Sequence, residues 1–458
     1  MDLNPFHEFV HSTTLPIFKL NPNQSSIIQS PKDFLTQLKL GIQNANNRII
    51  IASLYIGSGE EELIDLLNTK LSTNSNLKLV ILIDYFRGCR LDSNNVSSYT
   101  LLSPLVKNFP DQVKIHFYHA PVVSNLVKRI VPPRFIEGFG LQHIKTYGFD
   151  NDIIISGANL NKDYFENRQD RYIQIKNHEN LSDYNHQLIN TIGDYSYTIQ
   201  KTESGIELKS PFNGDRKQFI NNFRNRILQL TDDWNRKTTK IRSKYLNQSD
   251  FSIIIPALQM YPFGIQQDEL TLMNLLQHSI QNLNHTIHIA SGYFNLPQPL
   301  ESLLLKSQAD IKLLTAAPTA NGFYNSKGVS KYIPSAYSYL QWLFMSKINS
   351  KTTKSSITFY EYQRPQWTWH AKGVWIIPKH SNSLLTVIGS SNLNHRSWTR
   401  DLETQLYIIS HDDLLTKSLK CHLDSLYADS RPVDLTIVGR RRFHVVLKLA
   451  TRIIRNML

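Results

Sequence analysis

Short apolar segments alternate with amphipathic segments along much of the chain. Residues 50–57 (IIASLYIG) carry no charged side chain and end in glycine, a pattern typical of a buried strand. An amphipathic segment follows at 60–71, and another strand is predicted at 77–84. The same order recurs at 287–295, 297–306 and 311–316. Alternating strand and helix patterns predict an α/β fold with a largely parallel or mixed sheet.

The repetition extends to polar motifs. Four elements occur in the same order in both parts of the chain: Ile-Ala-Ser-x-Tyr at 51–55 and 289–293, His-x-Lys at 143–145 and 370–372, a small-residue turn with Asn-Leu-Asn at 156–161 and 389–394, and an acid 11 positions beyond the first Asn of that turn, Asp170 and Glu403. Repeats in a fixed order indicate internal duplication. The sequence therefore predicts two homologous α/β halves.

The pattern divides the chain into five parts. They are an N-terminal extension (1–29), a first half (30–212), a basic helical connector (213–250), a second half (251–436) and a basic amphipathic helix (437–458). In the connector, Phe219, Phe223, Ile227 and Leu230 recur at helical spacing. An ordinary surface helix of one half is the alternative interpretation. The polar segment 347–356 is predicted to be a loop.

The paired His-x-Lys motifs indicate phosphoryl chemistry. A neutral imidazole attacks phosphorus and a protonated one donates to a leaving oxygen, so His143 and His370 on opposite sides of one phosphate supply both functions. If the motifs lie on strands, Lys145 and Lys372 share the face of the histidines. A lone His-x-Lys is usually an incidental surface pair, but two copies in the same context favour a site.

Two further residue types complete the expected site. Asn159 and Asn392 can donate hydrogen bonds to phosphate oxygens, which stabilises charge in the transition state. An acidic residue can hold each imidazole in one tautomer. No CxxC or HExxH zinc signature is present, and this chemistry requires neither metal nor cofactor.

The string HIKTYGFD (143–150) resembles the HxKxxxxD motif of the phospholipase D superfamily. Longer strings are similar to eukaryotic phosphatidylglycerophosphate synthases: ASLYIGSGEEELIDLL (52–67), DYFRGCR (84–90), SGANLNKDYFENRQDRY (156–172) and GSSNLNHRSWTRDLETQL (389–406). The resemblance implies a phospholipase D-like pseudo-dimer with one active site at the junction of its halves. The second motif departs from the pattern, because Ile377 stands where its Asp would fall.

The resemblance also implies roles. Glu403 would orient His143, Asp170 would orient His370, and Asp150 belongs to the motif but mainly supports local structure. His143 would attack CDP-diacylglycerol and expel CMP, leaving a phosphatidyl-histidine. Glycerol 3-phosphate would then displace it to give phosphatidylglycerophosphate, the precursor of phosphatidylglycerol and cardiolipin, with His370 as acid and base. The reverse assignment of the two histidines remains open.

Several other residues are candidates for binding substrate. Arg87 and Arg90 follow a predicted strand, where α/β sheets usually bind ligands, and guanidinium groups bind phosphate bidentately. Surface arginines that cap a turn are the alternative. Arg168 lies two residues before Asp170 of the first copy, and Ser390 lies in the small-residue turn of the second copy; both are further candidates. Three tryptophans near His370 fit either a pocket or aromatic core packing: Trp367, Trp369 and Trp375.

The charge is consistent with anionic partners. Lys and Arg number 50 against 37 Asp and Glu, a formal charge of +13. Six basic residues lie in 440–455, and Val446, Leu449, Ile453 and Met457 form an apolar side, which predicts a helix on an anionic membrane surface. Packing of this helix onto the protein body is the alternative.

Other functions fit the sequence less well. A phospholipase D-like phosphodiesterase acting on nucleic acid or phospholipid is the main alternative, and an inactive scaffold is another. The lipid-synthase strings and intact motifs argue against both, so no nucleic-acid partner is expected. By resemblance alone, the protein is placed peripherally on the mitochondrial inner membrane, although no clear presequence is visible and no stretch is apolar enough to span a bilayer. The oligomeric state stays open.

Overall fold

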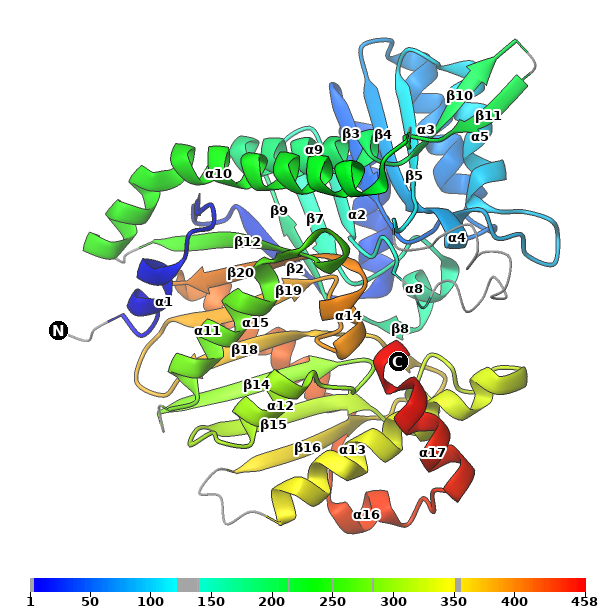
Figure 1. Ribbon diagram of the computed structural model, residues 1–458. Helices are drawn as coiled ribbons and strands as arrows, with labels where there is room; N and C mark the ends of the chain where they lie inside the picture. The colour runs from blue at the N-terminus through cyan, green and yellow to red at the C-terminus, as the bar shows by residue number, and fades with distance from the viewer. Residues whose placement is uncertain are drawn as a thin grey trace.

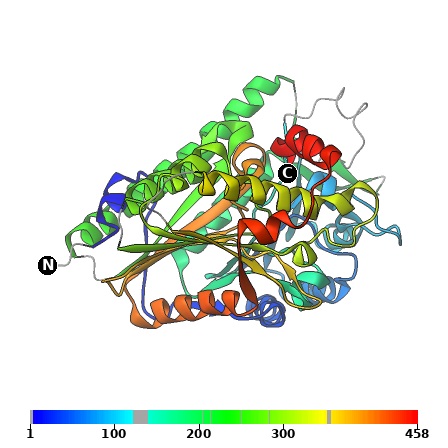
Figure 2. The same ribbon diagram turned by 90° about the horizontal axis from the view of Figure 1, so that it is seen from below.

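Two mixed β-sheets lie side by side, each covered by helices (Figure 1). The computed structural model describes residues 4–458 except 122–137, 139, 204, 213, 249–250, 282–283 and 351–355. Seen from below, the second sheet is sandwiched between helices on both faces (Figure 2). This is the mixed α/β architecture that the alternating sequence pattern predicts.

The first sheet has nine strands. In spatial order they are β11 (Gly205–Lys209), β10 (Tyr197–Thr202), β5 (Val113–Tyr118), β4 (Lys78–Asp84), β3 (Arg48–Ala52), β6 (Thr146–Phe149), β7 (Asp152–Ser156), β9 (Tyr172–Ile175) and β2 (Ser25–Ile28). The central strand β3 is buried from Ile49 to Ala52, which explains why these four residues are all apolar. It ends at Ala52, earlier than the apolar string suggests, and Ile56 instead bridges to Leu160.

The second sheet has ten strands. In spatial order they are β1 (Phe18–Leu20), β12 (Ser252–Met260), β20 (Leu402–Ser410), β19 (Leu384–Gly389), β18 (Gly373–Pro378), β14 (His285–Ser291), β15 (Asp310–Ala316), β16 (Ile357–Tyr362) and β21 (Ser430–Val433), with β13 (Ile265–Gln266) paired to β12. A separate two-stranded sheet joins β8 (Arg168–Gln169) to β17 (Thr368–Trp369).

The two sheets share one strand order. The run β5-β4-β3-β6-β7-β9 matches β16-β15-β14-β18-β19-β20. In each run the first three strands are parallel to one another and the remaining pairs are antiparallel. This matching order is what an internal duplication produces.

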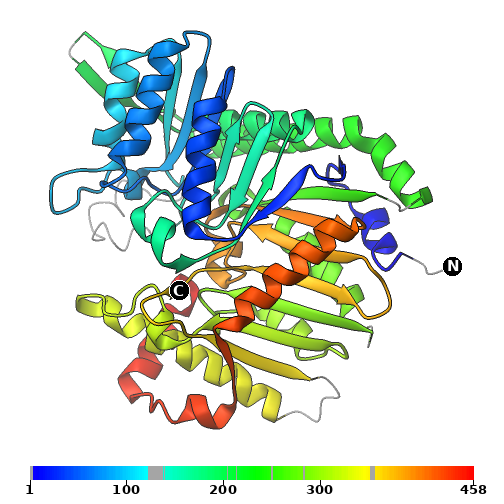
Figure 3. The same cartoon turned by 180° about the vertical axis from the view of Figure 1, so that it is seen from behind.

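Helices cover both sheets. In the first half they are α2 (Pro31–Asn44), α3 (Glu61–Thr73), α4 (Tyr85–Gly88), α5 (Ser98–Asn108), α8 (Lys162–Glu166) and α9 (Glu179–Asp194). In the second they are α11 (Gln267–Ser279), α12 (Gln298–Leu304), α13 (Ile333–Asn349), α14 (His395–Thr399), α15 (Asp413–Ala428), α16 (Leu435–Gly439) and α17 (Val445–Ile454). From behind, α15 crosses the second sheet and α2 the first (Figure 3).

Local sequence explains where such helices begin. Ser30 caps α2 by accepting a hydrogen bond from the Asp33 backbone, and Pro31 occupies the first turn. Phe34, Leu38 and Ile42 then follow at helical spacing and are buried. Because α13 keeps such buried residues through Met345, it continues to Asn349, so the loop predicted from residue 347 is wrong for its first three residues. The remainder of that segment lies largely outside the described residues.

The N-terminal residues are part of both sheets rather than a separate extension. α1 (His7–Ser12) packs against α10 and α11, β1 pairs with β12 of the second sheet, and β2 pairs with β9 of the first. The predicted boundary at residue 29 therefore falls just after two strands that connect the second sheet to the first.

A long helix connects the halves. α10 (Arg216–Gln248) carries Phe223, whose ring stacks on Phe263 of the second half with centroids 3.8 Å apart. On the other side, Phe223 meets the edge of Tyr195 of the first half. The helix predicted at the connector therefore contacts both halves, as a connector should. Among the residues that the structure describes, no helix is long and apolar enough to cross a bilayer.

Candidate active site

Each histidine motif pairs through its backbone with the other half of the chain. The His143 N–H donates to the Leu402 carbonyl at 2.9 Å, next to Glu403. The His370 N–H donates to the Gln169 carbonyl at 2.8 Å, next to Asp170. The two motifs therefore lie in extended segments just before β6 and β18, and not within strands as the sequence suggested. The backbone pairing places each imidazole next to an acid of the opposite half.

The structure brings together the histidine–acid pairs that the resemblance implied. His143 Nδ1 is 2.9 Å and 3.0 Å from the two carboxylate oxygens of Glu403. His370 Nδ1 is 2.6 Å from Oδ2 of Asp170. With Nδ1 engaged by an acid, the Nε2 atom of each ring is the one available for chemistry.

Both imidazoles are held in the neutral form. Burial, together with the charge of Lys145, holds the pKa of His143 well below its ordinary value. Burial and the charge of Lys372 have the same effect on the pKa of His370. A neutral imidazole carries the lone pair that a nucleophile or base needs.

The two acids differ in charge state. Burial raises the pKa of Glu403 to about 7, against the opposing charge of Lys145. Burial acts on Asp170 in the same direction, but the charge of Lys372 and the hydrogen bond with His370 outweigh it and hold the pKa of Asp170 below its ordinary value. Asp170 is therefore ionised at neutral pH, whereas Glu403 titrates close to it.

The two lysines lie beside the histidines and are fully buried. Lys145 Nζ donates to the backbone carbonyl of His143 at 2.7 Å, and Lys372 Nζ lies 2.8 Å from His370 Nδ1. Burial lowers the pKa of Lys145 to about 7 and also lowers that of Lys372. Lys372 fits closely, because a Cβ at Gly157 would stand 2.4 Å from its Nζ.

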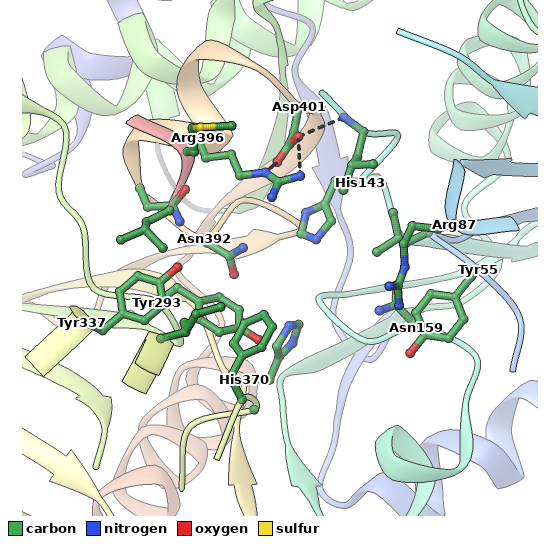
Figure 4. A pocket seen from close by; sticks show the side chains of 18 of the residues that line it. Tyr55, Arg87, His143, Asn159, Tyr293, Tyr337, His370, Asn392, Arg396 and Asp401 are labelled. Atoms are coloured by element: carbon green, nitrogen blue, oxygen red, sulfur yellow. Dashed lines mark hydrogen bonds and ion pairs between the residues drawn. The ribbon is translucent and has the colours of Figure 1, made fainter. Parts of the chain in front are cut away.

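One cavity of about 360 Å³ is lined by both histidines (Figure 4). Of the predicted residues, His143, His370, Asn159, Asn392, Arg87 and Arg168 line it. The Asn159 amide donates to the Tyr164 hydroxyl at 3.0 Å. Among the described residues, no three His, Cys, Asp or Glu side chains form a cluster that could hold a metal ion.

Two of the arginines that line the cavity are held by aromatic rings. The Arg87 guanidinium lies 4.7 Å from the centre of the Tyr55 ring, and that of Arg168 lies 4.4 Å from the centre of the Tyr164 ring. Asp84 caps the turn that presents Arg87, because its carboxylate accepts the Arg87 backbone N–H at 2.9 Å. Such positioned guanidinium groups suit phosphate oxygens.

Three predicted site residues lie elsewhere. Asp150 accepts the backbone N–H groups of residues 46–48 and holds the start of β3, which is the local structural role that the resemblance implied for it. Ser390 accepts the Thr404 N–H at 3.1 Å and steadies β20 instead of facing substrate. Arg90 is not among the residues that line the cavity.

Other uncertain side chains are also placed. Trp369 and Trp375 are fully buried and pack in the core, away from the cavity. Arg171 lies over the Trp375 ring and donates to the carbonyls of Lys372 and Val387, so it joins the halves rather than gripping substrate.

Sequence reasoning missed several residues of the cavity wall. Tyr55 and Tyr293 are the tyrosines of the repeated Ile-Ala-Ser-x-Tyr motif, so the repeat itself carried a signal for them. Asp401 pairs with Arg396 at 3.0 Å and accepts the Leu141 N–H at 2.9 Å, and its position two residues before Glu403 was the available clue. Figure 4 shows the pairing of Asp401 with Arg396 at one side of the cavity. Met457 and Leu458 also line it, and only the folded chain shows this.

The duplicated sheet order and the two crossed His–acid pairs define a phospholipase D-like protein. Consistent with this class, the family model described as "Cardiolipin synthase, PLD-like domain" matches residues 276–427. The structure is similar over its full length to phosphatidylserine synthase from Haemophilus influenzae, with a TM-score of 0.72 and 20% identity, covering 100% of both chains. At that identity the likeness shows the fold.

Sequence relatives identify the family more narrowly. The chain is 34% identical to the mitochondrial CDP-diacylglycerol–glycerol-3-phosphate 3-phosphatidyltransferase of Gallus gallus, covering 96% of this chain and 85% of the relative. It is 36% identical to the enzyme of that name from Saccharomyces cerevisiae, covering 98% and 92%. The human mitochondrial enzyme is 34% identical, covering 96% and 84%. The chain belongs to this family of phosphatidyltransferases.

Proposed function

We propose that this enzyme transfers the phosphatidyl group of CDP-diacylglycerol to glycerol 3-phosphate, giving phosphatidylglycerophosphate and CMP. The observation that carries the proposal is the pair of neutral imidazoles, each held by an acid of the opposite half and both lining one cavity. The names of the relatives supply the two substrates.

In the first step, Nε2 of His143 attacks the phosphorus that carries the diacylglycerol. The N–P bond forms as the bond from that phosphorus to the bridging oxygen of CMP breaks, and the bond electrons leave with CMP. A phosphate leaving group is stable as an anion, so this step needs no proton from the neutral His370. Glu403 holds Nδ1 of His143 and balances the positive charge that develops on the ring.

In the second step, His370 acts as the base. Its Nε2 takes the proton from the 1-hydroxyl of glycerol 3-phosphate as that oxygen attacks phosphorus and the N–P bond breaks. Asp170, which is ionised, stabilises the imidazolium formed. Asn159 and Asn392 line the cavity, and their amides would stabilise the added charge on the phosphoryl oxygens. Lys145 and Lys372, buried beside the histidines, would add positive charge behind them.

Arg87 and Arg168 are the arginines that we expect to bind the phosphate groups of the substrates. Arg87 and Arg168 line the cavity and would hold the phosphate of glycerol 3-phosphate or the pyrophosphate of the donor. We expect Arg87→Ala to raise the KM for glycerol 3-phosphate by about 10- to 100-fold, since a charge-assisted bidentate contact is lost. Arg90→Ala is the matched control, because Arg90 does not line the cavity, and it should change KM by less than about twofold.

The proposal includes peripheral attachment to an anionic membrane. Relatives from chicken and human are named as mitochondrial, and we place this enzyme at the inner membrane. α17 carries Lys448 and Arg452 beside exposed apolar residues, which suits such a surface. The alternative that this helix packs on the protein body also has support, because α17 lies against α13.

An acceptor comparison tests the function. Purified enzyme is given CDP-diacylglycerol with glycerol 3-phosphate, serine, glycerol or no acceptor, and CMP and lipid products are measured. We expect phosphatidylglycerophosphate with glycerol 3-phosphate and little product otherwise. Preferred transfer to serine, or release of phosphatidic acid by water, would overturn the acceptor assignment. Cleavage of DNA or RNA oligonucleotides in place of lipid transfer would point to a nucleic-acid phosphodiesterase.

A further inference from the structure

We infer that residues 324–332 and α17 together form a bilayer-inserting rim around the mouth of the active-site cavity, so that lipid substrate enters between them. This rim rests on the proposed function, because it assigns the route of a lipid donor. The 324–332 segment contains η4 (Gly328–Tyr332) and leads directly into α13. Both segments lie at the same end of the molecule, one in yellow and one in red (Figures 1 and 2).

Exposed apolar side chains are concentrated in these two segments. Of the 15 large apolar side chains that are exposed among the described residues, eight lie in 324–332 and 445–454, which together make up only 19 residues. Val329 is 78% exposed, Val446 78% and Ile453 82%. Scattered exposed apolar residues are ordinary, but a concentration at one place marks an interaction surface.

The rim is continuous with the cavity wall. Phe323 and Ile333, which flank the first segment, both line the cavity. Met457 and Leu458, which follow α17, line it too. Leu458 packs against the first turns of α13, which fixes both segments to one helix. The exposed residues therefore stand directly outside the opening through which substrate must pass.

The charge of the rim favours an anionic lipid surface. Neither 324–332 nor 445–454 contains an acidic residue, whereas the first contributes Lys327 and Lys331 and the second Lys448 and Arg452. Basic residues interleaved with apolar ones match a bilayer, where the apolar groups enter the acyl region and the cations meet headgroups. Tyr324 and Tyr332 suit the interface between these regions.

The size of the cavity explains why the rim is needed. At about 360 Å³, it lies near the small end of the range for drug-sized ligands, about 300–1,000 Å³. Such a volume receives the phosphate region of a lipid but leaves two acyl chains outside. An enzyme seated on the bilayer by its rim would let those chains stay in the membrane during the reaction.

Vesicle binding tests the rim. Full-length Val329→Asp and Ile453→Asp are compared with wild type by flotation with vesicles of phosphatidylcholine alone and of phosphatidylcholine mixed with cardiolipin. Leu270→Asp on α11 is the matched control, because Leu270 is 69% exposed but lies outside the rim. We expect each rim variant to bind mixed vesicles about tenfold or more weakly, and the control to bind like wild type. Unchanged binding by Val329→Asp would overturn the role of the 324–332 segment, and unchanged binding by Ile453→Asp that of α17.

Tryptophan fluorescence tests membrane insertion directly, so that weaker binding by a misfolded variant is not mistaken for loss of the rim. Tryptophan placed at Val329 should show emission shifted to shorter wavelength on mixed vesicles and quenching by brominated phosphatidylcholine, whereas tryptophan at Leu270 should not. Quenching at Leu270 alone would contradict the proposed orientation. Activity on vesicular CDP-diacylglycerol, divided by activity on a short-chain soluble analogue, should fall in Val329→Asp and not in Leu270→Asp. If wild type transfers neither substrate, the proposed function fails, while the binding data still judge the rim.

Discussion

The two histidine half-sites share one layout but differ in their surroundings. At His370, the imidazole Nδ1 lies close to both Asp170 and Lys372 Nζ, and Lys372 Nζ is 3.7 Å from Asp170. At His143, Lys145 instead donates to the backbone carbonyl, and Glu403 receives the imidazole with both carboxylate oxygens. Each half places one imidazole on the shared cavity, and the different residues around the two imidazoles give each a different electrostatic environment.

The Nε2 atoms differ in the same way. The Tyr164 hydroxyl is 3.4 Å from Nε2 of His370, while Nε2 of His143 has no hydrogen-bond partner among the described residues. An imidazole whose lone pair is unengaged is the better nucleophile, and one beside a hydroxyl is suited to exchange protons. This difference supports His143 as nucleophile and His370 as base.

Removal of either imidazole should have the largest effect. We expect His143→Ala and His370→Ala each to lower kcat by at least about 10⁴-fold, because each step of the transfer needs one of them. Rates of CMP release and of phosphatidylglycerophosphate formation provide the measurement. His380 is exposed in a turn and does not line the cavity, so His380→Ala serves as the control and should leave kcat unchanged. A residual rate within tenfold of wild type in either site variant would show that one half-site suffices.

The pH dependence of Glu403→Gln should distinguish the contribution of Glu403 from that of Asp170. Glu403 has a pKa of about 7, so a proton neutralises it as pH falls through 7, and wild-type kcat/KM should fall on that acidic side. Asp170, with its lowered pKa, stays ionised there and contributes no such limb. We expect Glu403→Gln to lower kcat by about 10²- to 10⁴-fold. The fall of kcat/KM as the pH drops through 7 should then be absent from its pH profile. An unchanged limb in that variant would assign it to another group.

Arg171 tests a structural asymmetry between the halves. It follows Asp170 and reaches Thr386, Val387 and Lys372 of the second half, whereas Thr404 follows Glu403. We expect Arg171→Ala to lower the free energy of unfolding by about 3–5 kcal/mol, because buried acceptors lose their donor. Denaturant unfolding measures this. The exposed Arg431→Ala is the control and should change stability by less than about 0.5 kcal/mol. Equal stability of the two variants would mean that Arg171 does not join the halves.

Asp150 should give the smallest effect on catalysis. Its carboxylate accepts three backbone N–H groups at the start of β3, and the second half has Ile377 at the matching position. We expect Asp150→Ala to lower the free energy of unfolding by about 1–3 kcal/mol, while kcat per folded molecule stays within about threefold of wild type. Asp150→Asn, which keeps one acceptor, should fall between. A loss of kcat comparable to that of Glu403→Gln would show that Asp150 acts in catalysis as well as in folding.

Much of the fold was predictable because its signals are local. Apolar strands such as β3 and β14, and the helices after them, appear in hydrophobic periodicity, and the repeated motifs mark the duplication. β1 and β2 were not predictable, because strands of three and four residues carry little periodicity and acquire their place only by pairing with β12 and β9. The end of α13 was missed for a related reason: its polar last turn is held by Lys347 pairing with Glu301, a distant residue.

The site divides along the same line. The histidines, lysines and asparagines belong to repeated motifs, so their chemistry could be predicted from the sequence. The resemblance to the family predicted that each acid would pair with the histidine of the opposite half. The roles of Arg171, Ser390 and Met457 depend on contacts between distant parts of the chain, which no local pattern encodes. Arg87 and Arg90 look alike in sequence, and only the turn capped by Asp84 places one of them on the cavity.

Covalent labelling tests the central claim most directly. Enzyme is mixed with CDP-diacylglycerol that carries ³²P in the phosphatidyl group, without glycerol 3-phosphate, then quenched under alkaline conditions and mapped by peptide. The account predicts label on His143 in wild type and in His370→Ala, no label in His143→Ala, and loss of label when glycerol 3-phosphate is added to wild type. Label on His370, or label that persists in His143→Ala, would contradict the division of roles between the two half-sites.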